Sequence, residues 1–163
     1  GAWSAPIAAR LGLRLPIQPG KGYSLTMARP AVCPRIPCSF AERRVVATPW
    51  PSGYRLGGTM EFSGFDAAPD PRRLAALTAA AGEYLVDPVG RPVVEEWTGL
   101  RPMTCDDLPV IGRAPRWRNL ILATGHGMLG ITAAPATGRL VAEIVCGREP
   151  HIDARPFRPE RFS

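Results

Sequence analysis

The sequence predicts an α+β fold in which a mostly antiparallel sheet carries one helix, and a strand, a turn and a helix follow near the C-terminus. Residues 16–60 hold short β-prone pieces between proline and glycine turn signals. Asp70-Pro71 is a helix start, because Asp is a favoured N-cap and Pro is favoured at the first helical position. Residues 119–146 combine a short apolar strand, a glycine-rich turn and a long apolar helix.

Composition limits the class of protein. An apolar share of 45% with 21% charged residues is typical of a folded globular chain rather than a disordered one. No apolar run approaches the roughly 20 residues that a membrane-spanning helix needs. The net charge of +6 comes mainly from scattered arginines. Because they form no basic stripe with interleaved aromatics, we expect no nucleic-acid binding.

The four cysteines predict no metal site. Cys33 and Cys38 are separated by four residues that include two prolines, and no second pair or histidine cluster completes a zinc site. We expect four reduced and mostly buried thiols, as in a cytosolic protein.

The first half of the chain contains the expected sheet. Apolar residues at helical spacing over residues 7–15, with Gly12 as a C-cap, predict a short helix first. Alternating patterns then predict strands over residues 22–27, 44–48 and 54–62. The last of these follows a Pro51-Ser52-Gly53 turn, which favours an antiparallel pairing.

The second half begins with the helix that starts at Asp70. Its apolar residues repeat at helical spacing as far as Leu85, and we expect the helix to end near Asp87-Pro88. A strand is expected over residues 93–99 and a loop over residues 101–115.

A strand over residues 119–124, a glycine-rich turn over residues 125–130 and a helix over residues 132–146 come next. Pro135 is expected in the first turn of this helix and Gly147 just past its end. From residue 148 onward we expect an ordered but irregular tail.

Two groups of residues are candidates for binding a ligand. The glycine-rich turn offers unpaired backbone N–H groups and the positive end of a helix dipole to an anionic or acceptor-rich group. A purely structural strand-to-helix turn is the alternative. Arg101, held by Pro102 after a strand, could bind a carboxylate at two points. A solvated surface arginine is the alternative there.

Four stretches together resemble the D-amino-acid dehydrogenase, glycine oxidase and sarcosine oxidase group of FAD-dependent oxidoreductases, the DAO-like family. Their order and spacing match along the whole chain. The stretches are Gly1-Ala2-Trp3-Ser4, Pro19-Gly20-Lys21-Gly22-Tyr23, residues 95–102 continuing to 108–112, and Gly125-His126-Gly127-Met128 running to residues 135–138.

The resemblance implies the roles of particular residues. Arg101 would bind the substrate carboxylate, and Met60 would line the substrate pocket. Tyr54 is a weaker pocket candidate, since packing in the sheet is the simpler explanation. The residues implied in FAD binding are Gly1, Ala2, Trp3, Gly125, His126, Gly127, Met128, Leu129, Gly130 and Ile131.

The resemblance also implies a reaction. A D-amino acid or small amino acid would be oxidised at its C–N bond by hydride transfer to flavin N5, giving an imine and then a keto acid and ammonia. No general base is needed, and His126 is expected to pack or to use its backbone rather than to act as an acid or base. A secondary-amine oxidase of the sarcosine or opine type, or a non-catalytic subunit of a split flavoenzyme, is the alternative.

The resemblance implies an incomplete enzyme. Residues 1–15 would end the FAD-binding domain, 16–102 would form the substrate-binding domain, and 103–163 would be the C-terminal FAD-binding segment and tail. The nucleotide-binding half would belong to the same or a separate chain, and the isolated chain would be inactive. We expect a cytoplasmic location; a peripheral contact with the inner membrane or a quinone would suit a dehydrogenase and the arginine-rich surface.

Overall fold

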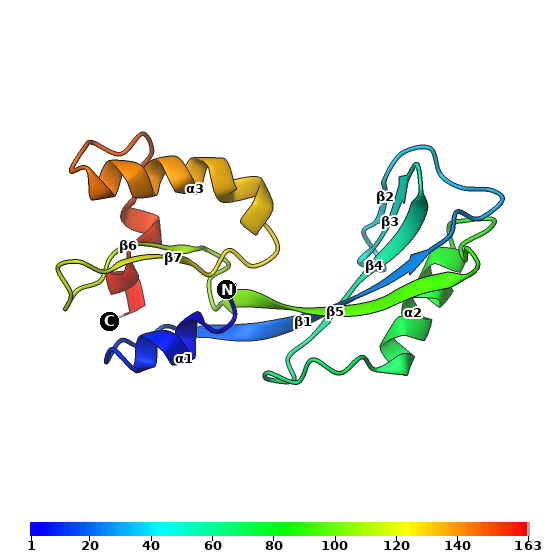
Figure 1. The fold of residues 1–163 in the computed structure, drawn as a ribbon, viewed down its shortest axis with the longest axis horizontal. Coiled ribbons are helices and arrows are strands. Elements are labelled where there is room, and N and C mark those ends of the chain that lie inside the picture. Colours follow the sequence, from blue (N-terminus) through cyan, green and yellow to red (C-terminus); the bar gives the residue numbers. More distant parts are fainter. Residues whose placement is uncertain (163) are drawn as a thin grey trace. The chain divides into compact units, whose positions relative to one another are not determined.

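The structure is a computed structural model that describes residues 1–162, and it divides into two compact units. The terminal unit comprises Gly1–Gly20 and the chain from Leu100 onward, and the sheet unit comprises Lys21–Gly99. Two long strands, β1 (Ile17–Met27) and β5 (Val93–Thr104), each continue from one unit into the other (Figure 1). The chain passes between the units after Gly20 and after Gly99, whereas the sequence placed domain boundaries at 15/16 and 102/103.

The sheet unit is built on a five-stranded sheet in the order β2-β3-β4-β1-β5. Its shorter strands are β2 (Cys38–Phe40), β3 (Val45–Trp50) and β4 (Gly53–Glu61). The pairs β2–β3, β3–β4 and β1–β4 are antiparallel, which confirms the predicted sheet. Trp50 pairs with Gly53 across the Pro51-Ser52 turn, so β3 and β4 form the expected hairpin.

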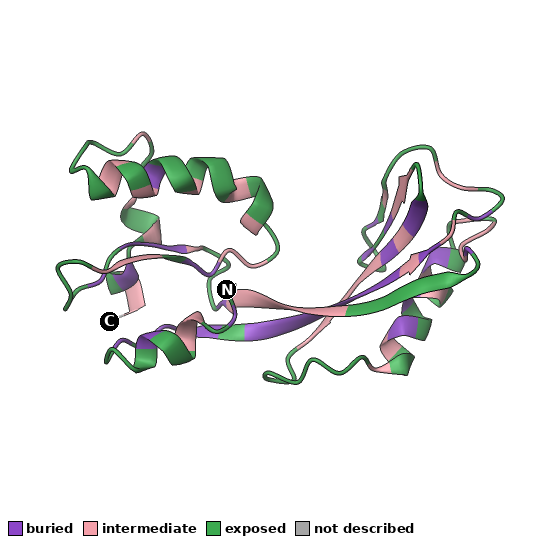
Figure 2. Ribbon diagram, in the orientation of Figure 1, coloured by how far each residue is buried: buried purple, intermediate pink, exposed green. Residues whose placement is uncertain are grey.

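Helix α2 (Pro71–Gly82) packs on one face of this sheet. The Asp70 carboxylate accepts a hydrogen bond from the Arg72 N–H at 2.8 Å, as expected of an N-cap. Residues of β1, β2, β3, β4 and α2 share one core. Its buried members are Tyr23, Leu25, Met27, Phe40, Val45, Ala47, Tyr54, Leu56, Leu74, Leu77 and Ala81 (Figure 2).

Helix α2 ends at Gly82, earlier than the position expected near Asp87. The Tyr84 ring stacks on Phe40 with its centroid 4.5 Å away. Leu85 packs against the core after a turn in which its N–H donates to Ala81. Both residues therefore repeat at helical spacing in the sequence but reach the core from a turn.

The terminal unit contains the two-stranded antiparallel sheet of β6 (Val110–Arg113) and β7 (Ile121–Thr124). Two α-helices, α1 (Ser4–Ala9) and α3 (Gly130–Val145), and two 3₁₀ helices, η1 (Arg155–Phe157) and η2 (Pro159–Phe162), complete the unit. One cluster of its buried residues comprises Ala8, Leu13, Leu15, Ile17, Val110 and Ala114. Gly147 has a φ of 65° and follows α3, as predicted.

Four local expectations are corrected. The segment expected as a loop over residues 101–115 instead extends β5 to Thr104 and contains β6. Pro102 is tolerated there because β5 is an edge strand, where a missing N–H breaks no ladder. The first helix lies over Ser4–Ala9 rather than residues 7–15, and Gly12, with a φ of 71°, follows it in a turn.

The other two corrections concern Pro135 and the thiols. Because α3 begins at Gly130, Pro135 lies in its second turn rather than its first. All four cysteines are free, but Cys105 and Cys146 are exposed rather than buried. Within residues 1–162, none of the helices has the length and apolar content to span a bilayer.

Candidate functional site

The structure joins the two segments that the sequence assigned to cofactor binding. The Ser4 and Thr124 hydroxyl oxygens lie 2.6 Å apart, and the amino group of Gly1 donates to Ser4 at 3.2 Å. Ala2 is buried. Thr124 ends β7 immediately before the glycine-rich turn, so the first residues of the chain lie at the start of that turn.

The glycine-rich turn has a backbone that requires glycine at two positions. Gly125 and Gly127 have φ values of 78° and 53°, in the left-handed region that side chains disfavour. A Cβ at Gly125 would also lie 2.7 Å from Thr104 Cγ2. The Gly127 N–H donates to the Pro102 carbonyl at 3.0 Å, which ties the turn to β5.

Beyond this turn, α3 presents an uncapped N-terminus with apolar side chains around it. No side chain among the described residues caps α3, and its first turn contains no acidic residue. Its positive dipole end is therefore available to an anionic group. Met128, Leu129 and Ile131 are 69%, 64% and 93% exposed, which is unusual for three large apolar side chains in one short segment.

His126 points back toward α3. Its Nε2 lies 3.0 Å from the Thr137 hydroxyl oxygen. Burial lowers the pKa of the imidazole below its ordinary value. A neutral imidazole paired with a helix side chain suits the packing role expected of it.

Arg101 is a half-buried cation without a compensating charge. Its Nη1 is buried and has no hydrogen-bond partner among residues 1–162. Burial alone lowers the pKa of the guanidinium below its usual value, and no carboxylate among residues 1–162 offsets it. Leaving such a donor unpaired is costly, so the side chain is suited to an anion supplied from outside the chain.

Arg101 and the glycine-rich turn are adjacent. Arg101 precedes Pro102, and the Pro102 carbonyl accepts the Gly127 N–H. The Arg101-Pro102 backbone, the glycine-rich turn and the first residues of the chain therefore lie in one region of the terminal unit.

The two remaining predicted residues, Met60 and Tyr54, belong to the sheet unit. Met60 is half-buried on β4. Tyr54 is 0% exposed inside the core, and its hydroxyl has no partner among the described residues. The expectation of Tyr54 as a pocket residue is therefore corrected to a core position, because no part of its ring reaches a surface.

Sequence reasoning missed two features. The Trp97 ring lies against Gly99, where an added Cβ would overlap the indole. Their i, i+2 spacing on one strand face was the signal that could have indicated this contact.

The second feature is a buried cluster around Lys21, which is 2% exposed and pairs with Glu61 at 2.6 Å. No local pattern in the sequence brings these two residues together.

Comparisons with known proteins agree on one family. A family model described as FAD dependent oxidoreductase matches residues 1–144. The chain is 38% identical over 167 residues to a D-amino acid dehydrogenase from Xanthobacter autotrophicus, covering 100% of this chain and 39% of that protein. The chain therefore spans about two fifths of the length of this curated relative.

Solved structures give the same result. Glycine oxidase from Geobacillus kaustophilus superposes with a TM-score of 0.86 at 31% identity, over 97% of this chain and 43% of that one. Iminodiacetate oxidase from Chelativorans superposes with a TM-score of 0.78 at 28% identity, over 98% of this chain and 44% of that one.

Proposed function

The chain belongs to the FAD-dependent oxidoreductase family, and from that premise we propose that it is part of an enzyme oxidising the C–N bond of a D-amino acid or small amino acid. The single observation that carries the proposal is the buried Nη1 of Arg101, which has no hydrogen-bond partner among residues 1–162. An amino-acid substrate brings a carboxylate, which matches the planar fork of a guanidinium.

The residues of the terminal unit fit FAD. The left-handed backbone at Gly125 and Gly127 allows close approach to main-chain N–H groups. The uncapped start of α3 favours negative charge, and exposed Met128, Leu129 and Ile131 offer apolar cover to a ring system. In this proposal Gly1 to Trp3 complete the cofactor contact, since their segment is bonded to the start of the turn.

When bound, FAD supplies the hydride acceptor, and the imine left on the substrate takes up water to give a keto acid and ammonia. Arg101 holds the carboxylate and thereby fixes the orientation of the substrate α-carbon. The N-terminal amides of α3 stabilise negative charge that develops at that end of the site. Met60 is the proposed contact for the substrate side chain.

Catalysis in this proposal needs more than the residues of this chain. A strand and glycine-rich turn for the ADP part of FAD would come from the remaining part of such an enzyme. The isolated chain should therefore purify without flavin absorbance and show no turnover. A visible flavin spectrum that stays with the chain through gel filtration would contradict this part of the proposal.

The test of the main proposal uses an enzyme completed by joining the chain to the remaining part of the Xanthobacter relative. Arg101→Lys should raise KM for a D-amino acid about tenfold or more, since a charged hydrogen bond contributes about 1.5–3 kcal/mol. Arg116→Lys, at an exposed position of the same unit, is the matched control and should leave KM unchanged. An equal KM for both variants would refute the role of Arg101.

The similarity to iminodiacetate oxidase supports a second candidate, a secondary-amine oxidase. The two candidates differ in product, because a primary amino acid releases ammonia and a secondary amine releases an amine. Ammonia measured with D-alanine and with an N-substituted glycine as substrates would separate them. Turnover of neither substrate would favour a non-catalytic subunit of a split flavoenzyme.

A further inference from the structure

Strand β4 contains an irregularity at Thr59. Gly22 of β1 pairs with Met60, but the next residue, Tyr23, pairs with Gly58, so Thr59 is an extra residue in the ladder. Thr59 has a φ of 49°, which is uncommon for a residue other than glycine and strained for a β-branched one. These two features define a β-bulge, a device that changes the direction of the side chains after it.

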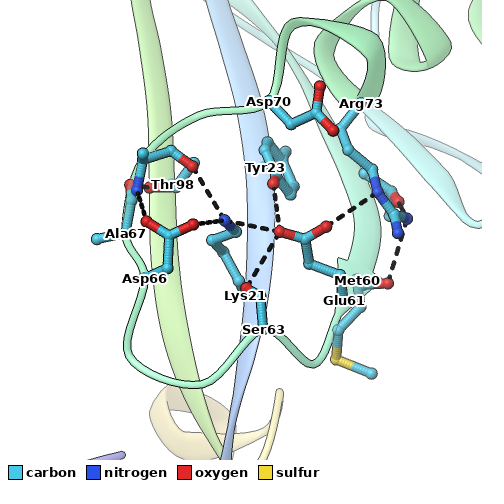
Figure 3. A network of polar contacts seen from close by, with 12 residues as sticks. Lys21, Tyr23, Met60, Glu61, Ser63, Asp66, Ala67, Asp70, Arg73 and Thr98 are labelled. Atoms are coloured by element: carbon cyan, nitrogen blue, oxygen red, sulfur yellow. Dashed lines mark hydrogen bonds and ion pairs between the residues drawn. The ribbon is translucent and has the colours of Figure 1, made fainter.

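The bulge decides which face of the sheet Met60 occupies. Side chains alternate between faces, so without the extra residue Met60 would join Leu56 in the core beneath α2. With the bulge, Glu61 takes the α2 side, opposite Lys21, and Met60 turns to the other face with Gly22. Figure 3 shows the Met60 side chain leading away from the polar contacts around Glu61.

Arg73 of α2 contacts Thr59 and the two residues that follow it. Its Nη1 donates to Thr59 Oγ1 at 2.9 Å and to the Met60 carbonyl at 3.4 Å. Its Nε lies 3.2 Å from Glu61 Oε2. One planar guanidinium thus holds three consecutive residues in place, which a flexible lysine ammonium cannot do with the same geometry (Figure 3).

Glu61 is itself fixed from the other side. Its Oε1 accepts from Lys21 Nζ at 2.6 Å and from the Tyr23 hydroxyl at 2.7 Å. Lys21 also donates to Asp66 and to the Ala68 carbonyl, which ties down the segment after β4. The pKa of Glu61 is lowered to about 2, chiefly by Lys21 and then Tyr23, so Glu61 remains charged at neutral pH.

We propose that Arg73, acting with Glu61, is a positioning residue that locks the Thr59 bulge and so holds Met60 on the sheet face away from α2, where it meets the substrate side chain. The contact between Met60 and the substrate side chain rests on the function proposed above for Met60, whereas the locking of the bulge by Arg73 does not. It follows that a residue on the far side of the sheet from Met60 controls which substrate side chains are accepted.

The lock is tested on the chain itself by ¹³C-methyl NMR of its methionines, of which Met27, Met103 and Met128 are internal references. Arg73→Gln and Arg73→Lys should both shift the Met60 methyl resonance and leave the three references in place. Arg72→Gln, at the exposed neighbouring position, is the matched control and should shift none. Adding Thr59→Gly to Arg73→Gln should restore the Met60 resonance, because glycine adopts the bulge conformation without the lock.

An unshifted Met60 resonance in a folded Arg73→Gln chain would overturn the lock. So would a failure of Thr59→Gly to restore it. Loss of all four resonances in both Arg73 variants would also overturn it, because Arg73 would then serve general stability.

The effect of Arg73 on substrate specificity is tested in the completed enzyme described above. There Arg73→Gln should change KM several-fold for substrates with large side chains and leave KM for glycine unchanged. An equal change for both substrates would overturn the link to specificity. Absence of turnover in the unmutated enzyme would be a failure of the proposed function, and the NMR result on the lock would stand apart from it.

Discussion

The two units differ in whether a buried cationic side chain has hydrogen-bond partners. In the sheet unit, Lys21 is almost fully buried and donates to Glu61, Asp66 and the Ala68 carbonyl. In the terminal unit, Nη1 of Arg101 is buried without a partner among the described residues. A paired buried charge contributes to a defined fold, whereas an unpaired one is a cost that a ligand can remove. The difference fits the division proposed above, in which the sheet unit is a scaffold and the terminal unit binds a ligand.

The two units also differ in how many apolar side chains their main helix buries. In the sheet unit, α2 buries Leu74, Leu77 and Ala81 against the sheet. In the terminal unit, Leu140 is the residue that α3 buries, although α3 is the longer helix (Figure 2). A helix normally gains its stability by burying an apolar face. The terminal unit therefore has more to gain from a ligand or a further protein segment than the sheet unit has.

The largest effect is expected from shortening buried leucines. Leu77 and Leu140 are both 0% exposed. Leu77→Ala should lower the free energy of unfolding by about 3 kcal/mol, because the surrounding core encloses the cavity on all sides. Leu140→Ala should lower it by about 2 kcal/mol, because a helix with a largely exposed surface can shift to fill the space.

Urea unfolding followed by hydrogen exchange would assign each loss to its unit. Leu77→Ala should accelerate exchange in the sheet unit and Leu140→Ala in the terminal unit. A greater loss from Leu140→Ala than from Leu77→Ala would remove the contrast between the two cores.

A smaller effect of the opposite sign is expected at Arg101. Arg101→Met should raise the free energy of unfolding of the ligand-free chain by about 1 kcal/mol, because it removes a half-buried charge that has no partner. Arg116→Met is the exposed control and should change it by less than about 0.5 kcal/mol. Thermal melts would measure both, and a destabilised Arg101→Met chain would mean that Arg101 is already satisfied within the fold.

Local signals in the sequence predicted local structure well. Asp70-Pro71 marks a helix start because the cap and its N–H lie two residues apart, and the hairpin at Pro51-Ser52 is equally local. The extension of β5 through Pro102 was missed because a proline in a strand is permitted only at an edge, and edge position is a property of the whole sheet.

The candidate site was only partly predictable for the same reason. Arg101 and the glycine-rich turn were identified from their motifs, but the contact between Pro102 and Gly127 requires the fold. The polar cluster was missed entirely, because Lys21, Glu61 and Arg73 come from three elements and no spacing links them. Tyr54 was a weaker pocket candidate, with packing in the sheet as the simpler explanation, and the core is where it lies.

The smallest effect is expected at acid pH. It distinguishes the units, because a different carboxylate is protonated and loses its stabilising contacts in each. Hydrogen bonds from the His151 ring and backbone, and then from Arg139, lower the pKa of Glu143 on α3 to about 2. The pKa of Glu61 in the sheet unit is also lowered to about 2. A carboxyl whose folded-state pKa is depressed stabilises the protein above its unfolded pKa of about 4.3, and that stabilisation is lost as the pH falls toward 2.

Both units should therefore loosen between about pH 4.3 and pH 2. Glu143→Gln should reduce this pH dependence in the terminal unit and Glu61→Gln in the sheet unit, because each substitution deletes one carboxyl group with a lowered pKa. Asp106 and Asp153 in the terminal unit and Asp66 in the sheet unit, whose pKa values are also lowered, retain the remainder. Hydrogen exchange at several pH values in this window would resolve the two. The effect of Glu143→Gln should be the smaller, since Glu143 holds one end of a helix and the residues after it, whereas Glu61 joins two strands to α2. Identical pH profiles for the two variants would show that the units unfold together, and the contrast between them would then lie in how their buried cations are paired and not in their stability.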